Sequence, residues 1–106
     1  MVESVLLYDL ERGVDLQAYV AWAKKTIGAV LKAPGVVEFR ASRNLLGSPY
    51  VRSISVWKSL ADWEKFAESD VWKAAEAELR AKFATVIHVE LWGPSPVAPE
   101  PLRPKA

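Results

Sequence analysis

The feature that most limits the fold is the order of two hydrophobic patterns along the chain. One has the spacing of a helix and the other is typical of a strand. Apolar residues recur at helical spacing from Leu16 to Leu31, directly after Asp15 and before Pro34 and Gly35. Asp15 is a suitable N-cap, and the Pro-Gly pair ends a helical pattern. The sequence therefore predicts a first helix between these two signals.

A second helical pattern occupies the other half of the chain, from Ser59 to Phe83. Ser59 and Asp62 have the spacing of a capping box at its start. Ser69 offers a second cap within the pattern, so we expect the helix to restart or kink before Val71.

Four segments rich in apolar and β-branched residues surround these helices, and turn residues lie between the middle two. We expect strands from Val2 to Leu10, Val36 to Arg43, Tyr50 to Trp57 and Thr85 to Trp92. The resulting βαββαβ order predicts an α+β fold of the ferredoxin-like type, a two-layer sandwich with both helices on one face of an antiparallel sheet. We expect one domain over residues 1–92, followed by a Pro-rich extended or disordered tail over residues 93–106.

Alternation along the strands predicts which side chains share a face of the sheet. The face expected under the helices collects Val37, Phe39, Ala41, Ile54, Val56, Ile87, Val89 and Leu91. The opposite face collects Ser42, Ser53 and Ser55 with larger polar and aromatic residues. Aromatic rings beside charged groups suit a partly wet interface, and the ferredoxin-like sheet leaves two open edges. We therefore expect a homodimer, a dimeric α+β barrel, with these residues in its interior: Glu38, Arg40, Trp57, His88, Glu90 and Trp92.

Composition excludes several classes of function. Lys and Arg number 14 against 13 for Asp and Glu, and the positive residues do not cluster, which argues against nucleic acid and membrane surfaces as partners. With Cys 0 and His 1, neither a thiolate nor an imidazole-rich metal site is expected. The N-terminus lacks the features of a signal peptide. We expect a cytoplasmic protein without a bound metal.

Three short stretches carry a resemblance to a known family. They are Pro34-Gly35, the run Val56-Trp57-Lys58-Ser59, and the run from Ser69 to Ala75, Ser-Asp-Val-Trp-Lys-Ala-Ala. Together they resemble the antibiotic biosynthesis monooxygenase family of dimeric α+β barrels. The resemblance covers roughly residues 2 to 92, and the third stretch is similar to the haem-degrading members. It implies a pocket in each subunit and oxidation of aromatic or quinol-like compounds without a cofactor.

The chain departs from the haem-degrading members at the positions that matter for their chemistry. Where they have an Asn, a Trp and an iron-binding His, the matching motifs place Leu6, Phe66 and Glu76. Without the imidazole this helix offers no iron ligand. Haem degradation is therefore not expected.

Glu76 is the candidate catalytic residue. It falls about 40° from the centre of the apolar stripe of its helix, at about 100° per residue. A carboxylate beside an apolar pocket could take a proton from an acidic substrate hydroxyl or carbon. The alternative is that Glu76 leans outward and pairs with Arg80 at i+4. His88 raises a similar choice between an acid/base role and a hydrogen-bonded interface histidine.

Five tryptophans are many for 106 residues and could enclose a flat aromatic ligand. Residues expected to line the pocket are Leu6, Tyr8, Trp63, Phe66 and Trp72, with the Tyr8 hydroxyl orienting a substrate oxygen.

Three hypotheses follow. The first is a cofactor-free monooxygenase-like enzyme acting on a small aromatic or quinol-type compound. The second is a non-catalytic ligand-binding or stress-related protein. The third is an isomerase or decarboxylase of a small acid, for which Arg40 or Arg52 would bind the carboxylate.

Overall fold

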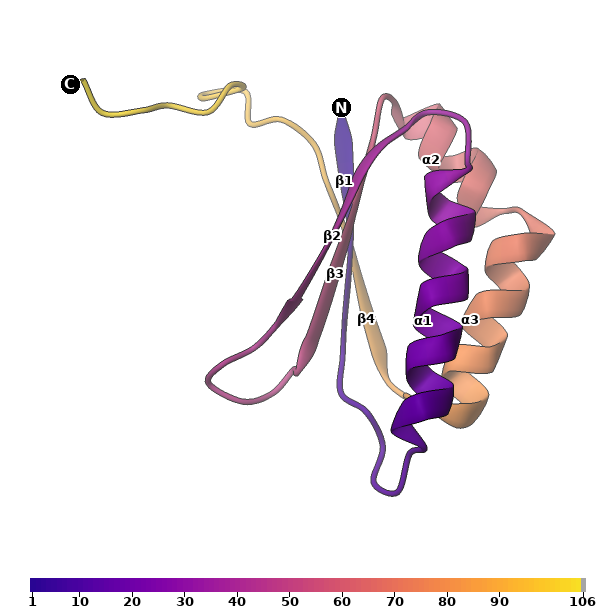
Figure 1. The fold of residues 1–106 in the computed structure, drawn as a ribbon. Helices are drawn as coiled ribbons and strands as arrows, with labels where there is room; N and C mark the ends of the chain where they lie inside the picture. The colour runs from indigo at the N-terminus through magenta and orange to yellow at the C-terminus, as the bar shows by residue number, and fades with distance from the viewer. Residues whose placement is uncertain (106) are drawn as a thin grey trace.

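The computed structural model describes residues 1–105 as a four-stranded antiparallel sheet with three helices on one face (Figure 1). Along the chain the elements are β1 Val2–Tyr8, α1 Leu16–Leu31, β2 Val36–Arg43, β3 Val51–Trp57, α2 Leu60–Ala67, α3 Asp70–Lys82 and β4 Ile87–Trp92. The strands lie in the order β2-β3-β1-β4. The ferredoxin-like fold predicted from the element order is therefore confirmed.

Side-chain caps fix where the helices begin. Asp15 accepts hydrogen bonds from the backbone nitrogens of Gln17 and Ala18 at 3.0 and 3.2 Å. Ser59 accepts from the Asp62 nitrogen at 3.1 Å and Ser69 from the Trp72 nitrogen at 3.3 Å. The second helical pattern is thus split in two at Ser69, as the sequence predicts. None of the helices within residues 1–105 combines the length and the apolar character needed to cross a membrane.

The turn between α1 and β2 is pinned to the start of α2. Gly35 has φ +86°, and a Cβ placed there would lie 2.3 Å from Cγ of Asp62. The Gly35 carbonyl also accepts a hydrogen bond of 2.8 Å from the Lys58 nitrogen. Only glycine satisfies both the positive φ and this close approach.

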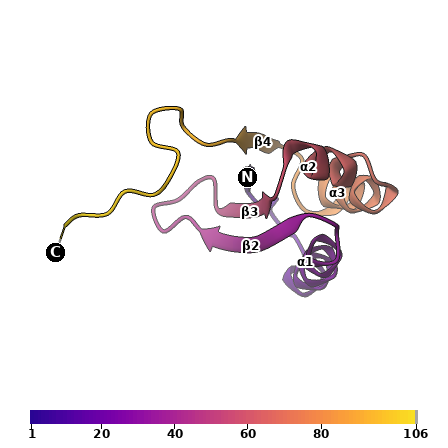
Figure 2. The same cartoon turned by 90° about the horizontal axis from the view of Figure 1, so that it is seen from above.

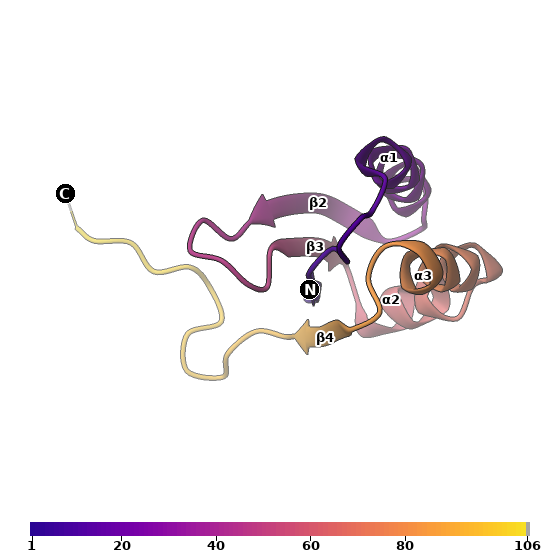
Figure 3. The same ribbon diagram turned by 90° about the horizontal axis from the view of Figure 1, so that it is seen from below.

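Within residues 1–105, the face of the sheet away from the helices carries no layer of secondary structure (Figures 2 and 3). Strands β2 and β4 are the two edges of the sheet. Residues 93–105 contain neither helix nor strand, and in all three ribbon views they run from the end of β4 away from the helices. We refer to the face of the sheet that lies away from the helices as the open face.

The strand pairing corrects the predicted faces at β3. Ser55 lies opposite Ser4 and Phe39, and Ser53 opposite Leu6 and Ala41, so these serines lie on the helix side. The residues that the pairing places on the open face are instead Ile54 and Val56 with Val5 and Leu7.

The reason for the correction is the position of one large side chain, Trp57. It is fully buried beneath α2, where its ring stacks on Phe66 at 5.2 Å between centroids. Because side chains alternate along a strand, this placement turns every second residue of β3 toward the helices. A register shift between Val36 and Glu38 also places Val37 at an irregularity of β2, where it is 45% exposed.

Candidate functional site

A cavity of about 430 Å³ lies between the sheet and the helices. Every element contributes to its wall, with β1 and β3 forming the floor and α1, α2 and α3 the opposite side. The volume falls in the range of small-molecule sites. This cavity is the candidate functional site.

The floor of the pocket carries hydroxyl groups as well as aliphatic side chains. Ser4, Ser53 and Ser55 line it from the two central strands, together with Leu6. The Ser55 hydroxyl also accepts a hydrogen bond of 2.9 Å from Trp57 Nε1. The floor can therefore contact a ligand that has both apolar and polar edges.

One end of the pocket is closed by two tyrosines. Tyr8, at the end of β1, and Tyr19, on α1, join their hydroxyls in a hydrogen bond of 2.7 Å. Burial raises the pKa of Tyr8 well above the ordinary tyrosine value, and burial also raises the pKa of Tyr19. Both phenols therefore keep their protons at neutral pH.

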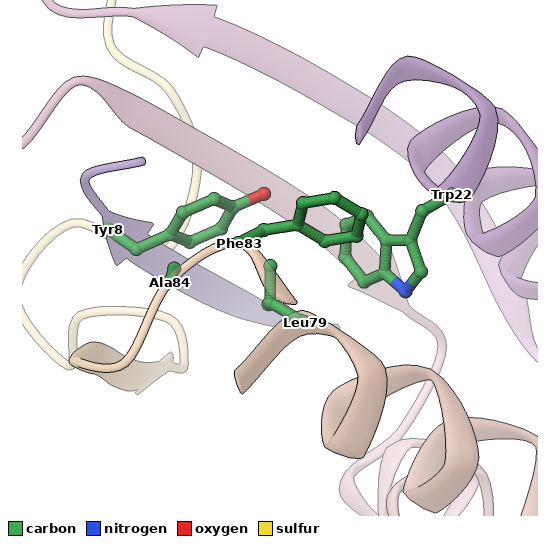
Figure 4. Close-up of a cluster of buried hydrophobic side chains, with 5 residues drawn as sticks. All are labelled: Tyr8, Trp22, Leu79, Phe83 and Ala84. Carbon is green, nitrogen blue, oxygen red and sulfur yellow. The ribbon is translucent and has the colours of Figure 1, made fainter. Parts of the chain in front are cut away.

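Buried side chains pack behind the tyrosines at this end of the pocket. Tyr8 belongs to a buried cluster with Trp22, Leu79, Phe83 and Ala84 (Figure 4). The Trp22 indole is fixed in turn, because its Nε1 donates a hydrogen bond of 3.0 Å to the Ala75 carbonyl on α3.

The other end of the pocket is aromatic as well. Phe66 lies between Trp57 and Trp72, with its ring centroid 5.2 Å from the first and 5.9 Å from the second. Trp63 joins this wall from the same helix as Phe66. A flat aromatic ring could stack against these side chains.

Two charged side chains of α3 reach the pocket wall, Lys73 and Glu76. The Glu76 side chain is 36% exposed, and its Oε1 lies 3.9 Å from Arg80 Nε. The structure is thus compatible with both alternatives for Glu76. Its carboxylate lines the cavity, as a catalytic residue would, and it also pairs with Arg80 at i+4. Exposed i,i+4 pairs contribute little to stability, so Arg80 leaves Glu76 free to move toward a ligand.

The structure brings the six expected site residues to one cavity. Leu6, Tyr8, Trp63, Phe66, Trp72 and Glu76 all line it. Sequence reasoning missed Tyr19, Trp22 and the serines of the floor. The first two belong to the apolar stripe of α1, a pattern that marks a buried face without telling core from pocket wall.

The residues expected inside a dimer separate into two groups. The pairing places Glu38, Arg40, His88, Glu90 and Trp92 on the open face. Trp57 was wrongly assigned to it, because this side chain is buried on the helix side within one chain.

Hydrogen bonds organise the open face along its two edge strands. Arg40 pairs with Glu38 and, at 2.7 Å, with Glu3 Oε1. On β4, Glu90 accepts hydrogen bonds from Trp92 Nε1 at 3.0 Å and from His88 Nε2 at 2.9 Å. These bonds to Trp92 and His88 lower the pKa of Glu90.

The placement of the open-face residues bears on two further expectations. Arg40 and Arg52 point away from the pocket, so neither can bind the carboxylate of a ligand within it. His88 is also on the far side, and within residues 1–105 no three His, Cys, Asp or Glu side chains cluster as a metal site would require. Lys73 is the cation that the wall does present.

A comparison with protein families identifies the class of this fold and site. Residues 8–78, more than half of the chain, match the model of the antibiotic biosynthesis monooxygenase family. The chain therefore belongs to that family.

Solved structures give the same fold at low sequence identity. SnoaB from Streptomyces nogalater, described as a cofactor-independent oxygenase, is 17% identical with a TM-score of 0.75, and the match covers 93% of this chain and 97% of SnoaB. The Arabidopsis thaliana protein At3g17210 is 16% identical with a TM-score of 0.78, covering 92% and 99%. A conserved protein from Methanosarcina mazei Go1 is 15% identical with a TM-score of 0.75, covering 86% and 89%. A search of curated sequences found no significant match.

Proposed function

We propose that this protein is a cofactor-free monooxygenase acting on a small aromatic or quinol-type compound in the pocket between the sheet and the helices. The observation that carries the proposal is the pocket itself, an aromatic-walled cavity of about 430 Å³ with a carboxylate in its wall. Membership of the monooxygenase family and the likeness to a cofactor-independent oxygenase support it.

In the proposed reaction Glu76 removes a proton from the bound substrate. Deprotonation makes an electron-rich ring that can transfer electrons to O₂ directly. For a quinol, one oxygen atom becomes a ring hydroxyl, the other leaves as water, and the ring becomes the quinone. All four electrons gained by O₂ then come from the substrate.

We also propose that the protein works as a cytoplasmic homodimer formed through the open face. Half-buried Ile54 and Leu7 lie at the centre of this face, with charged residues of both signs on the edge strands around them. A second copy would cover the apolar centre and could pair Glu38 and Arg40 with His88 and Glu90 of its partner.

The test is oxygen uptake with a panel of quinols and other phenols. We expect uptake with at least one compound, and we expect Glu76→Gln to abolish it while the protein remains folded. Glu78→Gln is the matched control, because Glu78 is on the same helix, pairs with Lys82 at 3.5 Å and does not line the pocket. Unchanged uptake in Glu76→Gln would remove this residue from the mechanism.

A second candidate function is ligand binding without catalysis. The Glu76 contact with Arg80 favours it, since the carboxylate then has a partner on its own helix and need not act on a ligand. Tight binding of an aromatic compound without uptake of oxygen or any other turnover would support this function over the first. Turnover of a small acid without oxygen uptake would instead indicate an isomerase or decarboxylase.

A further inference from the structure

The two tyrosine hydroxyls at the end of the pocket form a unit, whereas the sequence predicted a role only for the Tyr8 hydroxyl, the orientation of a substrate oxygen. Two phenols carry two protons, and the 2.7 Å bond between Tyr8 and Tyr19 uses one of them. The other proton remains available to an acceptor in the cavity that both side chains line. The pair therefore has one hydrogen-bond donor to offer.

This donor is held in place before any ligand arrives. The Tyr19 ring stacks on Trp22 with centroids 5.8 Å apart and meets Phe83 edge-on at 5.5 Å. Tyr8 is only 5% exposed. Figure 4 shows its hydroxyl directed away from the backbone and toward the ring of Phe83. A donor fixed by packing needs little reorganisation when it binds an oxygen atom.

The surroundings favour a negatively charged acceptor over a neutral one. Hydrogen bonds to an ionised oxygen are about twice as strong as those between neutral groups. An apolar wall strengthens them further, and a donor that also accepts a hydrogen bond is polarised by it. Because both tyrosines keep their protons at neutral pH, the pair acts as a donor and does not repel an anion.

We propose that the Tyr8–Tyr19 pair binds the oxygen of a phenol or enol ligand and stabilises it as the oxyanion. The ligand class is therefore a flat aromatic compound with an acidic hydroxyl at one edge, held by the tyrosines while its rings contact the aromatic wall. This inference rests on the proposed function only for the location of the ligand, and it requires no reaction with oxygen.

The experiment is a spectroscopic pH titration of 2-naphthol bound to the protein, with naphthalene as the ligand that lacks the hydroxyl. We expect the ionisation constant of bound 2-naphthol to fall about 10- to 100-fold in the double variant Tyr8→Phe/Tyr19→Phe, the loss expected for a hydrogen bond to a charged group. Each single variant should lose part of this effect. Tyr50→Phe is the matched control, since Tyr50 is 44% exposed and lies outside the pocket wall.

The charges of Lys73 and Glu76 also act on a bound oxyanion, and they are the same in all four variants. A difference between variants therefore reports on the hydroxyls. Thermal unfolding of each variant checks that the pocket is intact, and Tyr19→Phe carries the test if the Tyr8 change unfolds the protein.

Three results would overturn the inference. One is equal ionisation of bound 2-naphthol in the wild type and in Tyr19→Phe. Another is wild-type protein that binds naphthalene as tightly as 2-naphthol, and the third is wild-type protein that binds neither compound. If the wild type binds and ionises 2-naphthol in the expected way while no phenol supports oxygen uptake, the proposed oxidation fails and the tyrosine site stands.

Discussion

At the centre of the sheet, the two faces differ in the opposite sense from what burial alone would suggest. At the centre of the face covered by helices are the hydroxyl groups of Ser4, Ser53 and Ser55. The central strands turn Val5, Leu7, Ile54 and Val56 toward the open face. In a sheet covered on one side only, the aliphatic residues would be expected beneath the helices.

The difference indicates that each face is adapted to binding as well as to folding. The covered face leaves a cavity above its serines, so its centre is suited to a ligand rather than to close packing. Leu7 and Ile54, which are only half-buried at the centre of the open face, suit burial by another protein surface. The following predictions test this comparison, from the largest expected effect to the smallest.

Trp57 carries the largest expected effect, because it is the side chain that sets the orientation of β3. We expect Trp57→Ala to lower the free energy of unfolding by about 3 to 5 kcal/mol, the usual cost of truncating a buried aromatic residue. Urea denaturation measures it. Trp92→Ala is the control, since Trp92 is 57% exposed in the single chain. Equal losses in monomeric protein would mean that the two faces do not differ as described.

A charge at the centre of the open face should prevent self-association. We expect Ile54→Glu to weaken dimer formation by roughly 100-fold, about 3 kcal/mol, because a carboxylate replaces an apolar side chain and would have to be desolvated in each copy. Light scattering over a concentration series measures the association. Lys24→Glu, on the exposed side of α1, should leave it unchanged. A wild-type protein that stays monomeric would refute the dimer.

Filling the floor of the pocket should affect binding more than folding. We expect Ser53→Val to lower the affinity for an aromatic ligand about 10-fold while changing the free energy of unfolding by less than about 1 kcal/mol, because the added methyl group enters open space. Calorimetry and urea denaturation measure the two quantities. Ser42→Val places the same change on the open face and should leave ligand affinity unaltered. An affinity that survives Ser53→Val would place the ligand elsewhere.

The smallest expected effect is a pH dependence on the open face. The pKa of Glu90 is lowered by hydrogen bonds from Trp92 and His88. A carboxyl group with a lowered pKa in the folded state adds stability above its unfolded pKa and loses it as the pH falls through the folded value. Trp92→Phe removes the first of these donors and should move the pKa of Glu90 back up. NMR titration of the carboxyl carbon measures the shift, and an unchanged titration would show that the indole has no influence.

Local signals account for the parts of the fold that the sequence predicted well. The caps at Asp15, Ser59 and Ser69 act within one helical turn, and the order of strands and helices leaves few topologies to choose from. Contacts between distant segments account for the rest. The orientation of β3 depends on how Trp57 packs against Phe66, and no pattern within the strand records that contact.

In the candidate site too, local sequence signals predicted some residues and contacts between distant segments determine the others. Family motifs and helical spacing were enough to select Leu6, Phe66 and Glu76. The hydrogen bond between Tyr8 and Tyr19 joins two elements whose separation depends on the packing of α1 on the sheet. The periodicity from Leu16 to Leu31 predicts a helix but does not predict which hydroxyl Tyr19 meets across the pocket.

The close approach of Gly35 to Asp62 constrains how this chain can change during evolution. A side chain at position 35 would collide with the carboxylate at position 62, and the same carboxylate belongs to the cap of α2. A substitution of Gly35 would need a smaller residue at position 62, which removes that cap contact, and it would still place a side chain at a positive φ. Gly35 should therefore be retained among relatives, and mutational paths that change it should be closed.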